Sequence, residues 1–548
     1  MTRLKRYFPF LKWPRPSTGL LRSEAMAGLT VGLMVIPQGV AYAALAGMPL
    51  VTGIYASMLP ALVAVLFGAS QRLSVGPTAL SCLLVSAALG TIATPGSAEW
   101  VNLAVWLALL SGAAQIALGM ARFGWLLNLV NAPVLMAFTQ AAAVLILLSQ
   151  WKALTGWVGW SGQASGGPIH WTSLAFGLGS LALLMASKRW RPRFPSVLMI
   201  VVISAALSYG MGFAARGGQV VGELPSGFPG LFVPAWPGWA TLGHLLLPVL
   251  VITLVSFLET ASSARVDNAR SGVSWNQNQD LIGQGLAKLA AGLSGAFPTS
   301  SSFSRSALNL YAGAQTGWAT IFSVGVVGLS LLFFLPVLRH VPQATLAAIV
   351  VVAVLGLVRP GQFRRVWGIS RVEGAIALVT FAITVLAAPR LYWGVIAGVL
   401  MALCHFLYLR LHPRIIEVGL HEDGRMRDRH LWNLPPLAPR TFALRLDAAL
   451  DFSSARALER AISDHLMQHP DTQRVVLFAQ PINRIDATGV EAFATIRWQL
   501  AEQGRILFVV GLKLPVERAL RAANELNPDR HLRVRVTDGE LLDSIRST

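Results

Sequence analysis

Carboxylate side chains are nearly missing from the first three-quarters of this sequence. Charged residues make up 13% of the 548 positions, whereas soluble domains average about 25%. Residues 1–411 contain only seven of the 25 Asp and Glu residues, namely Glu24, Glu99, Glu223, Glu259, Asp267, Asp280 and Glu373. A water-exposed globule of this size needs many more charges. We therefore expect residues 1–411 to form a polytopic membrane protein surrounded by the lipid bilayer.

Cysteine and clustered histidine are scarce as well. The two cysteines, Cys82 and Cys404, both lie in apolar runs, so we expect no disulfide framework. The ten His residues show no spacing typical of metal ligands, and no nucleophile–base pair is visible. The sequence therefore predicts no metal site, no cofactor and no enzymatic activity.

Basic residues are abundant, with 44 Lys and Arg and a formal net charge of +19. They lie between apolar runs and do not alternate with aromatic residues on one face, so we expect no nucleic-acid partner. Residues 1–23 and the stretch SKRWRPR are rich in positive charge, which is typical of cytoplasmic flanks. These patterns predict a basic, cytoplasmic N-terminus over 1–23 in a multi-pass protein of the plasma (bacterial inner) membrane.

Apolar runs recur from residue 24 to residue 411, the predicted transmembrane domain. We expect fourteen spans, at 24–44, 53–68, 77–91, 101–120, 130–149, 171–187, 195–213, 245–265, 280–295, 303–312, 317–336, 343–358, 373–388 and 391–411. A stretch rich in Gly, Pro and Trp at 214–240 separates two halves of seven spans, at about 24–213 and 245–411. Because each half has an odd number of spans, the second half must be inverted relative to the first.

The tail has a different composition. Residues 412–548 hold 19 basic and 18 acidic residues, the balance of a soluble domain. Strand-like runs such as RVVLFA and RILFVVG alternate with amphipathic helical stretches. We therefore interpret 412–437 as a linker and 438–548 as a small cytoplasmic α/β domain.

The third span of each half is short and interrupted. SVGPTALSCLLVSAALG lies at 74–90 and FPTSSSFSRSALNLYAG at 297–313, and each has Pro–Thr followed by small or hydroxyl residues. Broken segments at corresponding positions of two repeats indicate a transport site near the middle of the membrane. Two unrelated kinked helices packed through Ser and Thr are the alternative.

Half-helices in these segments would present unpaired N–H groups to an anion. The first turns at Thr78–Ala79 and Phe303–Ser304 would each carry the positive end of a helix dipole. Arg305 adds a full positive charge within the first turn, where it opposes the dipole unless an anion or a carboxylate lies opposite. Alternatively, the hydroxyl groups only cap the helices and Arg305 extends toward water.

Other polar residues in apolar runs have open roles. Glu259, in FLETASSAR, is either a protonatable coupling group or an ion-pair partner of Arg305 or Lys288. Lys288 lies two turns beyond Asp280 and either faces Glu259 or the substrate, or forms a structural salt bridge. Gln38 and Tyr42 share a helix face and either line a cavity or pack against neighbours.

Several stretches together resemble the SulP family of anion transporters with a C-terminal STAS domain. They are IPQGVAYAALAGMPLVTGIYAS, SVGPTAL, FLETASSAR, NQDLIGQGLAKLAAGLSGAFPTSSSFSRSALN and, in the tail, DATG. The resemblance implies a membrane all-α, fourteen-segment 7+7 inverted-repeat fold with core and gate domains, followed by a small α/β STAS domain. It also implies a homodimer in which the core domain moves like an elevator.

The resemblance also assigns site residues by position. The substrate-binding residues it implies are Gln38, Tyr42, Thr78, Ala79, Phe303, Ser304 and Arg305. Glu259 matches the acidic position of proton-coupled sulfate carriers. Lys288 stands where the family commonly has Asn, and Ser300–Ser302 and Ala296 are further departures. Lys288 and Asp280 are therefore candidates for modulating the site.

The tail motif comprises Asp486, Thr488 and Gly489. Soluble relatives of the STAS domain have a phosphorylatable Ser two residues after the Asp, and Thr488 occupies that spacing here. The alternative is a tight turn at a helix N-terminus without regulatory chemistry. The partners of the tail cannot be deduced from this motif.

The sequence as a whole predicts a secondary active transporter of a small inorganic anion, with sulfate–proton symport through Glu259 as the leading interpretation. Bicarbonate, dicarboxylate or chloride transport or exchange on the same fold is the first alternative. A membrane anion receptor that signals through the STAS domain is the second.

Overall fold

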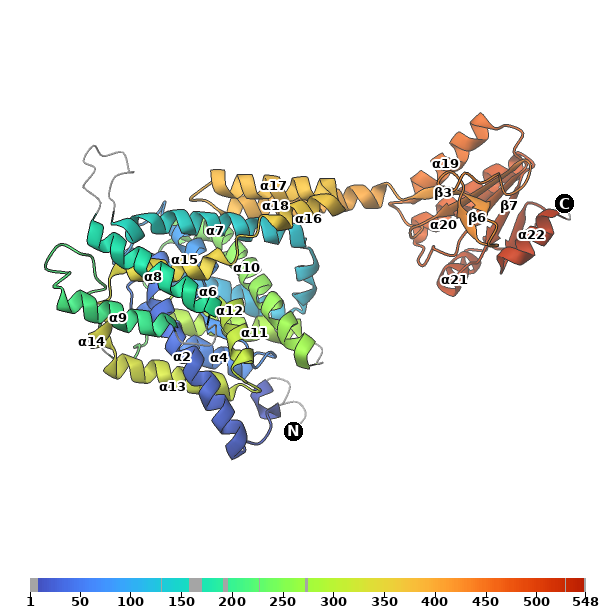
Figure 1. Ribbon diagram of the computed structural model, residues 1–548. Helices are drawn as coiled ribbons and strands as arrows, with labels where there is room; N and C mark the ends of the chain where they lie inside the picture. The colour runs from blue at the N-terminus through green and yellow to red at the C-terminus, as the bar shows by residue number, and fades with distance from the viewer. Residues whose placement is uncertain are drawn as a thin grey trace. The chain divides into compact units, whose positions relative to one another are not determined.

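The computed structural model describes residues 8–129, 131–156, 170–190, 196–225, 227–271, 275–527 and 529–546. The chain divides into a helical unit, Met1–Ala402, and a tail unit, Leu403–Thr548 (Figure 1). Residues 1–7 of the predicted basic N-terminus lie outside the described residues.

The first half of the helical unit follows the short 3₁₀ helix η1 (Pro9–Lys12). Its helices are α2 (Thr18–Leu45), α3 (Thr52–Tyr55), α4 (Leu59–Phe67), α5 (Ala79–Leu89), α6 (Ala98–Met120), α7 (Ala132–Thr155), α8 (Trp171–Trp190) and α9 (Ser196–Gly210), with η2 (Phe123–Leu129) between α6 and α7. The second predicted span is therefore two pieces, α3 and α4, because the chain turns at Ala56–Met58 ahead of Pro60.

The second half repeats this order. Its helices are α10 (Trp239–Ser271), α11 (Gln277–Leu293), α12 (Phe303–Tyr311), α13 (Trp318–Phe333), α14 (Leu335–Leu338), α15 (Gln343–Leu355), α16 (Gly361–Ile369), α17 (Arg371–Leu386) and α18 (Tyr392–Leu411). The prediction missed α16, since no side chain of this short basic helix is buried and it gives no apolar run. Among the described residues, five helices are long and apolar enough to cross a membrane: α2, α6, α7, the Trp239–Arg265 part of α10, and α18.

Helix contacts in the two halves are equivalent. α2 packs on α5 and α12, and its counterpart α10 packs on α12 and α5. In the same way, α8 packs on α15 while α7 packs on α17. This correspondence is what an inverted repeat requires, and the helical unit has the fourteen-segment 7+7 inverted-repeat fold.

Small residues let α6 approach α11 closely. A Cβ atom on Gly112 would lie 2.7 Å from the Gly285 carbonyl oxygen, and one on Gly285 would lie 2.6 Å from the Gly112 oxygen. Any larger side chain at either position would force the helices apart. This contact presses α11 against the middle of the unit, where Lys288 is fully buried.

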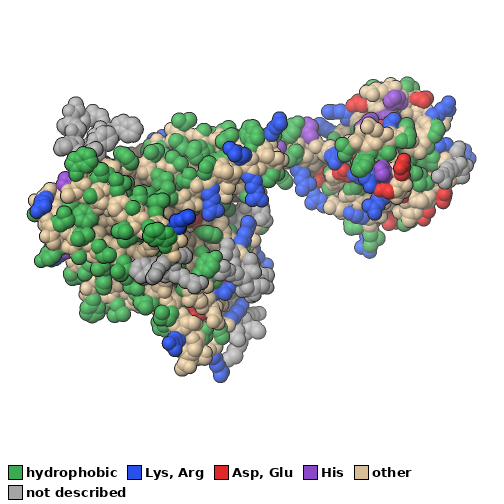
Figure 2. Space-filling view, viewed as in Figure 1, with side chains coloured by type: hydrophobic (Ala, Val, Ile, Leu, Met, Phe, Trp, Pro, Cys, Tyr) green, Lys and Arg blue, Asp and Glu red, His purple; other side chains and the backbone are tan. Residues whose placement is uncertain are grey.

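The surfaces of the two units differ as their compositions predict. Hydrophobic side chains cover much of the visible face of the helical unit, while basic and acidic side chains mix over the tail (Figure 2). Exposed apolar residues of the helical unit include Leu183, Phe333 and Leu386. Exposed hydrophobic surface on this scale fits an integral, multi-pass membrane protein.

The tail is a six-stranded sheet of order β4–β3–β5–β6–β7–β8. Its strands are β3 (Ile415–Leu420), β4 (Met426–Asp428), β5 (Thr441–Leu446), β6 (Arg474–Phe478), β7 (Ile506–Val510) and β8 (Leu532–Arg535). Strands β5 to β8 are parallel, and the apolar runs of β5, β6 and β7 are buried between helices on both faces. Helices α19 (Ala455–Gln468), α20 (Ala487–Glu502) and α21 (Leu514–Ala522) cover one face, and α22 (Asp538–Arg546) covers the other.

The interpretation of 412–437 as a linker is wrong for residues 415–428, which contain β3 and β4. β3 pairs antiparallel with β5 through Ile415–Leu446 and neighbouring residues, and β4 pairs with β3. The sequence IIEVGL is short and follows a long apolar helix, so its strand pattern was masked by the end of that helix. Both strands belong to the tail sheet.

Two of the seven carboxylates in the helical unit hold loops in place. Glu24 is fully buried and accepts hydrogen bonds from the backbone N–H groups of Gln315, Thr316 and Ala319 at 2.8–2.9 Å. It thereby fixes the start of α13 against α2. Asp280 accepts from the N–H groups of Ala69 and Ser70.

This arrangement predicts that Glu24→Gln destabilises the protein. The amide would turn one of its two acceptor oxygens into a donor that faces backbone N–H groups, at a cost of about 2–3 kcal/mol. Thermal unfolding of the purified full-length protein in detergent measures the effect. The matched control is Glu99→Gln, since Glu99 is exposed in the first turn of α6 and should leave the melting temperature unchanged. Equal melting temperatures for both variants would contradict the role of Glu24.

Candidate anion-binding site

The two broken segments meet as a short β ribbon. β1 (Val75–Gly76) pairs antiparallel with β2 (Ser300–Ser301), with Val75 opposite Ser301 and Gly76 opposite Ser300. The Ser302 N–H also donates to the Ser74 carbonyl oxygen at 3.0 Å. The pairing satisfies backbone groups that would otherwise be unpaired inside the membrane. It therefore explains how non-helical backbone is tolerated here.

A helix begins directly after each strand. Thr78 caps α5 by accepting from the Ser81 N–H at 3.3 Å, and Ser302 caps α12 by accepting from the Arg305 N–H at 3.4 Å. Because the strands are antiparallel and paired, both helix N-termini start from the same ribbon. The structure thus brings together Thr78–Ala79 and Phe303–Arg305, as the sequence predicts.

Arg305 is buried and spans the ribbon. Only 1% of its surface is exposed, and its guanidinium donates to the Pro77 carbonyl oxygen at 2.8 Å and to the Ser74 hydroxyl at 3.3 Å. Its Nη2 atom has no hydrogen-bond partner among the residues that the structure describes. Arg305 therefore ties α12 to the chain before α5 and keeps one donor available, so it does not extend toward water.

Glu259 approaches the site from α10. The Thr78 hydroxyl donates to Glu259 Oε2 at 3.2 Å, and the carboxylate is partly buried. Within the described residues, no salt bridge joins Glu259 to Arg305 or Lys288, so the ion-pair alternative lacks direct contact in this structure. Glu259 is therefore linked through Thr78 to the start of α5.

The predicted lining residues differ in exposure. Gln38 and Tyr42 are buried on α2, and Gln38 Oε1 has no hydrogen-bond partner in the described part of the chain. Tyr42 lies close enough to interact electrostatically with Arg305. Phe303 and Ser304 are exposed at the start of α12, whereas Ala79 is buried. The side chains of Phe303 and Ser304 are therefore the accessible part of this constellation.

Lys288 and Asp280 are not paired with each other. Lys288 is fully buried, and its Nζ atom donates to the Ser256 hydroxyl of α10 at 2.6 Å. Both oxygens of Asp280 are occupied, since Oδ2 accepts from the Ser70 hydroxyl and from Trp275 Nε1 in addition to the backbone contacts of Oδ1. Asp280 fixes the loop after α4, and this position favours a structural role over modulation of the site.

Sequence reasoning missed the polar layer behind the ribbon. Ser256 accepts from Lys288 and from Gln115 of α6, while Gln284 and Thr260 donate to the Ser301 hydroxyl. These residues sit singly in apolar runs, and only their shared burial identifies them. Among the described residues, no group of His, Cys, Asp and Glu could hold a metal ion.

The tail motif forms the start of α20. Asp486 caps the helix by accepting from the Gly489 N–H at 2.8 Å, and its second oxygen accepts from the Phe452 N–H at 3.1 Å. A Cβ atom on Gly489 would overlap the backbone of Leu450, so the position requires glycine. Thr488 is exposed in the first turn. The motif thus has a tight structural turn and an accessible hydroxyl residue together.

A nearby acidic residue is also firmly held. Burial alone would raise the pKa of Asp451, but hydrogen bonds from Ser453 and the charge of Arg484 outweigh it and hold the pKa below its ordinary value. Asp451 is therefore ionised at neutral pH and stabilises the loop that contacts Asp486.

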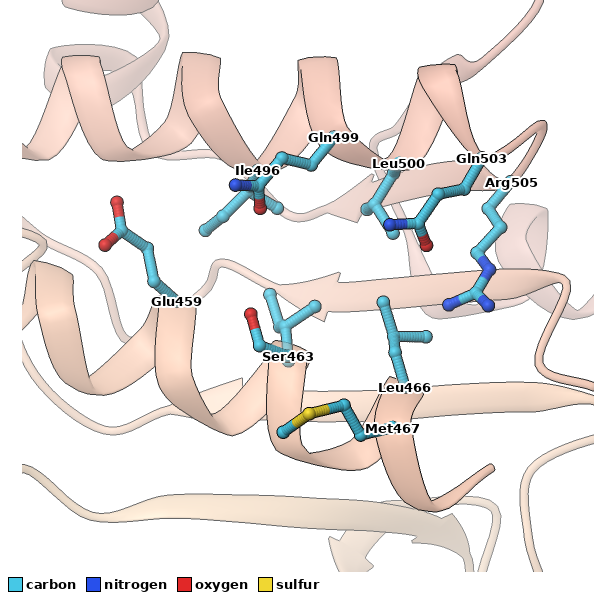
Figure 3. A pocket seen from close by; sticks show the side chains of 10 residues that line it. Glu459, Ser463, Leu466, Met467, Ile496, Gln499, Leu500, Gln503 and Arg505 are labelled. Carbon is cyan, nitrogen blue, oxygen red and sulfur yellow. The ribbon is translucent and has the colours of Figure 1, made fainter. Parts of the chain in front are cut away.

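The tail also contains a cavity of about 200 Å³ between α19 and α20 (Figure 3). Leu466, Met467 and Leu500 form its apolar part, and Glu459 and Arg505 lie at its two ends. The motif residues Asp486, Thr488 and Gly489 do not line it. Cavity and motif are therefore separate features of the tail.

The inverted repeat, the paired half-helices and the apolar surface define a multi-pass membrane transporter. The chain matches the model of the sulfate permease family over residues 21–380, and that of the STAS domain over residues 436–528. The protein therefore belongs to the sulfate permease family. It is an anion transporter with a C-terminal STAS domain, and not an enzyme.

Curated relatives agree with this assignment. The chain is 32% identical to a protein described as a probable sulfate transporter of Mycobacterium tuberculosis over 518 residues, covering 92% of each chain. It is 31% identical to probable sulfate transporter 4.2 of Arabidopsis thaliana over 528 residues, covering 91% of this chain and 77% of the relative. It is also 27% identical to the sodium-independent sulfate anion transporter of Bos taurus over 564 residues, covering 95% and 89%.

Solved structures share the fold. The murine Solute Carrier 26 family member A9 anion transporter, in its inward-facing state, matches with a TM-score of 0.87 at 20% identity, over 99% of this chain and 95% of that one. The transmembrane domain of a cyanobacterial bicarbonate transporter, BicA, matches with a TM-score of 0.57 at 18% identity, over 70% and 98%.

Thr78 both caps α5 and donates to Glu259, so Thr78→Val should affect stability and anion binding. Loss of the cap costs about 1 kcal/mol, and we expect sulfate to bind several-fold more weakly because the helix end and Glu259 lose their link. Isothermal titration calorimetry of the purified protein measures the affinity. Ser97→Ala removes an equivalent cap from α6, so it controls for stability and should leave the affinity unchanged. A similar loss of affinity in both variants would contradict a local role of Thr78.

Proposed function

We propose that the protein is a secondary active transporter of sulfate that moves one anion together with protons. The observation that carries this proposal is the site in which two helix N-termini and the unpartnered Nη2 of Arg305 converge beside Glu259. The relatives described as sulfate transporters support sulfate as the cargo.

The anion would bind mostly through backbone donors. The first N–H groups of α5 and α12 are free of intrahelical partners, and each helix end carries about half a positive charge. Phe303 and Ser304 are exposed at this point, which gives an anion access. Arg305 adds a full charge and one available donor. Gln38 and Tyr42 of α2 would complete the lining.

Glu259 would couple the anion to the proton. Among the described carboxylates of the helical unit, Glu259 is the one that accepts a hydrogen bond from the N-cap of a half-helix, the Thr78 hydroxyl at the start of α5. Protonation would remove its negative charge when sulfate is bound nearby, because two like charges in a poorly solvated site repel strongly.

Transport would follow an elevator-type movement. α5, β1, β2 and α12 are joined to α2, α10 and α4 by contacts, whereas α7, α8, α15 and α17 pack on one another. The first group would form the core that holds the anion, and the second the gate against which it moves. We expect a homodimer, in the plasma membrane, with the N-terminus and the tail in the cytoplasm.

Other cargos fit the same geometry. Bicarbonate, chloride and dicarboxylates would each meet the same helix ends, and the structural likeness to a bicarbonate transporter favours testing bicarbonate first. A receptor function is the alternative of another class, since Thr488 is exposed beside the Asp486 turn and could be modified in response to anion binding.

Uptake of labelled sulfate into proteoliposomes tests the cargo. Purified protein should accumulate sulfate when an inward proton gradient is imposed, and little without one. Competition by unlabelled bicarbonate, chloride and succinate ranks the alternatives. The receptor hypothesis replaces transport if no tested anion enters the proteoliposomes and anion binding instead changes the modification of the tail or its binding to a partner.

Two substitutions test the proposed roles. Glu259→Gln should abolish the dependence of uptake on the proton gradient, because the amide cannot be ionised. Arg305→Ala should weaken sulfate binding by about 10- to 100-fold, the value of one or two charge-assisted hydrogen bonds. Arg216→Ala is the matched control, since Arg216 is exposed outside the site. Unchanged proton dependence in the first variant, or unchanged affinity in the second, would refute the corresponding role.

A further inference from the structure

Lys288 is a buried cation in a transporter that buries few charges. It is 0% exposed on α11, and the hydrogen bond from Nζ to the Ser256 hydroxyl is 2.6 Å long. α6 closes the other side, where a Cβ atom on Gly112 would lie 3.1 Å from the Lys288 Cβ. Burial of an ammonium group is costly unless other charges compensate it.

The charged groups that face Lys288 come from several elements. Glu259 of α10 interacts electrostatically with both Lys288 and Arg305. Tyr42 of α2 and Cys82 of α5 are the other titratable groups near this set. On the α6 side, Gln115 donates to the same Ser256 hydroxyl that accepts from Lys288. Two cations therefore share a single carboxylate.

Neither cation has that carboxylate as a direct partner. No salt bridge to Lys288 or Arg305 occurs in the part of the chain that the structure describes. Arg305 Nη2 is buried, and among the described residues it has no hydrogen-bond partner. An excess of positive charge beside this donor points to an anion as the missing partner.

We propose that Lys288 fixes the valence of the anion, and thereby whether a proton accompanies it. This inference rests on the proposed anion site. Arg305 and Lys288 supply two positive charges, and Glu259 supplies one negative charge when ionised. A monovalent anion neutralises this set with Glu259 ionised. A divalent anion neutralises it only when Glu259 takes up one proton.

Removal of Lys288 lowers the total charge of this set by one positive charge. With Asn in its place, the set is already neutral when Glu259 is ionised and no anion is bound. A monovalent anion then requires protonated Glu259, and a divalent anion leaves one uncompensated negative charge even then. Lys288→Asn should therefore shift the preference from sulfate toward chloride, and chloride binding should acquire a proton.

Titration calorimetry in two buffers of different protonation enthalpy counts the protons taken up for each anion bound. The full-length protein is titrated with potassium sulfate and with potassium chloride. The wild type should take up about one proton per sulfate and none per chloride. Lys288→Asn should lower the ratio of sulfate affinity to chloride affinity at least tenfold and take up about one proton per chloride.

Lys288→Arg is the matched control, because it keeps a permanent positive charge at the same position. It should preserve both the proton counts and the affinity ratio of the wild type. If sulfate binding by the Lys288→Arg variant takes up no proton, then the proton taken up by the wild type binds to Lys288. Lys288 is then not a fixed charge, and the proposal is overturned. Glu259→Gln should remove the proton uptake that accompanies sulfate.

The wild-type proton counts test the valence proposal even if Lys288→Asn does not fold. Equal counts for sulfate and chloride overturn the valence proposal and leave sulfate transport standing. Conversely, protein that binds sulfate with one proton but transports none in proteoliposomes refutes the proposed transport and supports the role of Lys288. The two failures are therefore distinguishable.

Discussion

The pairing of β1 with β2 is the contact on which the helical unit depends. Two residues from each repeat, Val75–Gly76 and Ser300–Ser301, satisfy one another's backbone groups within the helical unit, as non-helical backbone in a membrane protein requires. The same pairing sets the two helix starts on one ribbon, so a backbone requirement also creates the geometry of the proposed anion site. Arg305 reinforces it by donating to Pro77 and Ser74 of the opposite strand segment. The β1–β2 pairing therefore both stabilises the ribbon and positions the two helix N-termini of the proposed site.

The few carboxylates of the helical unit differ in how many fixed partners they have, and this difference distinguishes structural residues from a candidate functional one. Glu24 and Asp280 are each surrounded by several donors and hold loops, and Asp267 forms a salt bridge with Arg72. Glu259 instead has only hydroxyl partners among the described residues, Thr78 and Ser300, and two nearby cations. A carboxylate with few fixed donors can exchange a proton at a lower cost than one whose protonation would break several hydrogen bonds. This difference singles out Glu259 among the buried acids.

The sequence predicted the fold class and the pairing of 74–90 with 297–313, because Pro–Thr and hydroxyl residues interrupt apolar runs at equivalent places. It could not show that Arg305 binds the opposite strand segment, since that contact joins residues more than two hundred positions apart. It also missed Ser256, Gln115 and Gln284, which are single polar residues in apolar runs, and α16, which has no buried side chain. Local patterns indicate where helices break, whereas networks between helices require the packed structure.

The fold does not select the anion. The same architecture occurs in an anion transporter and in a bicarbonate transporter that are at most 20% identical to this chain, so helix ends alone cannot discriminate between cargos. Backbone N–H groups and dipoles attract any small anion. Discrimination by charge must come from side chains whose charges lie within reach of the site and are poorly screened. In the proposed site those are Arg305, Glu259 and Lys288, and under the valence proposal the sum of their charges, rather than any one of them, distinguishes a divalent from a monovalent anion.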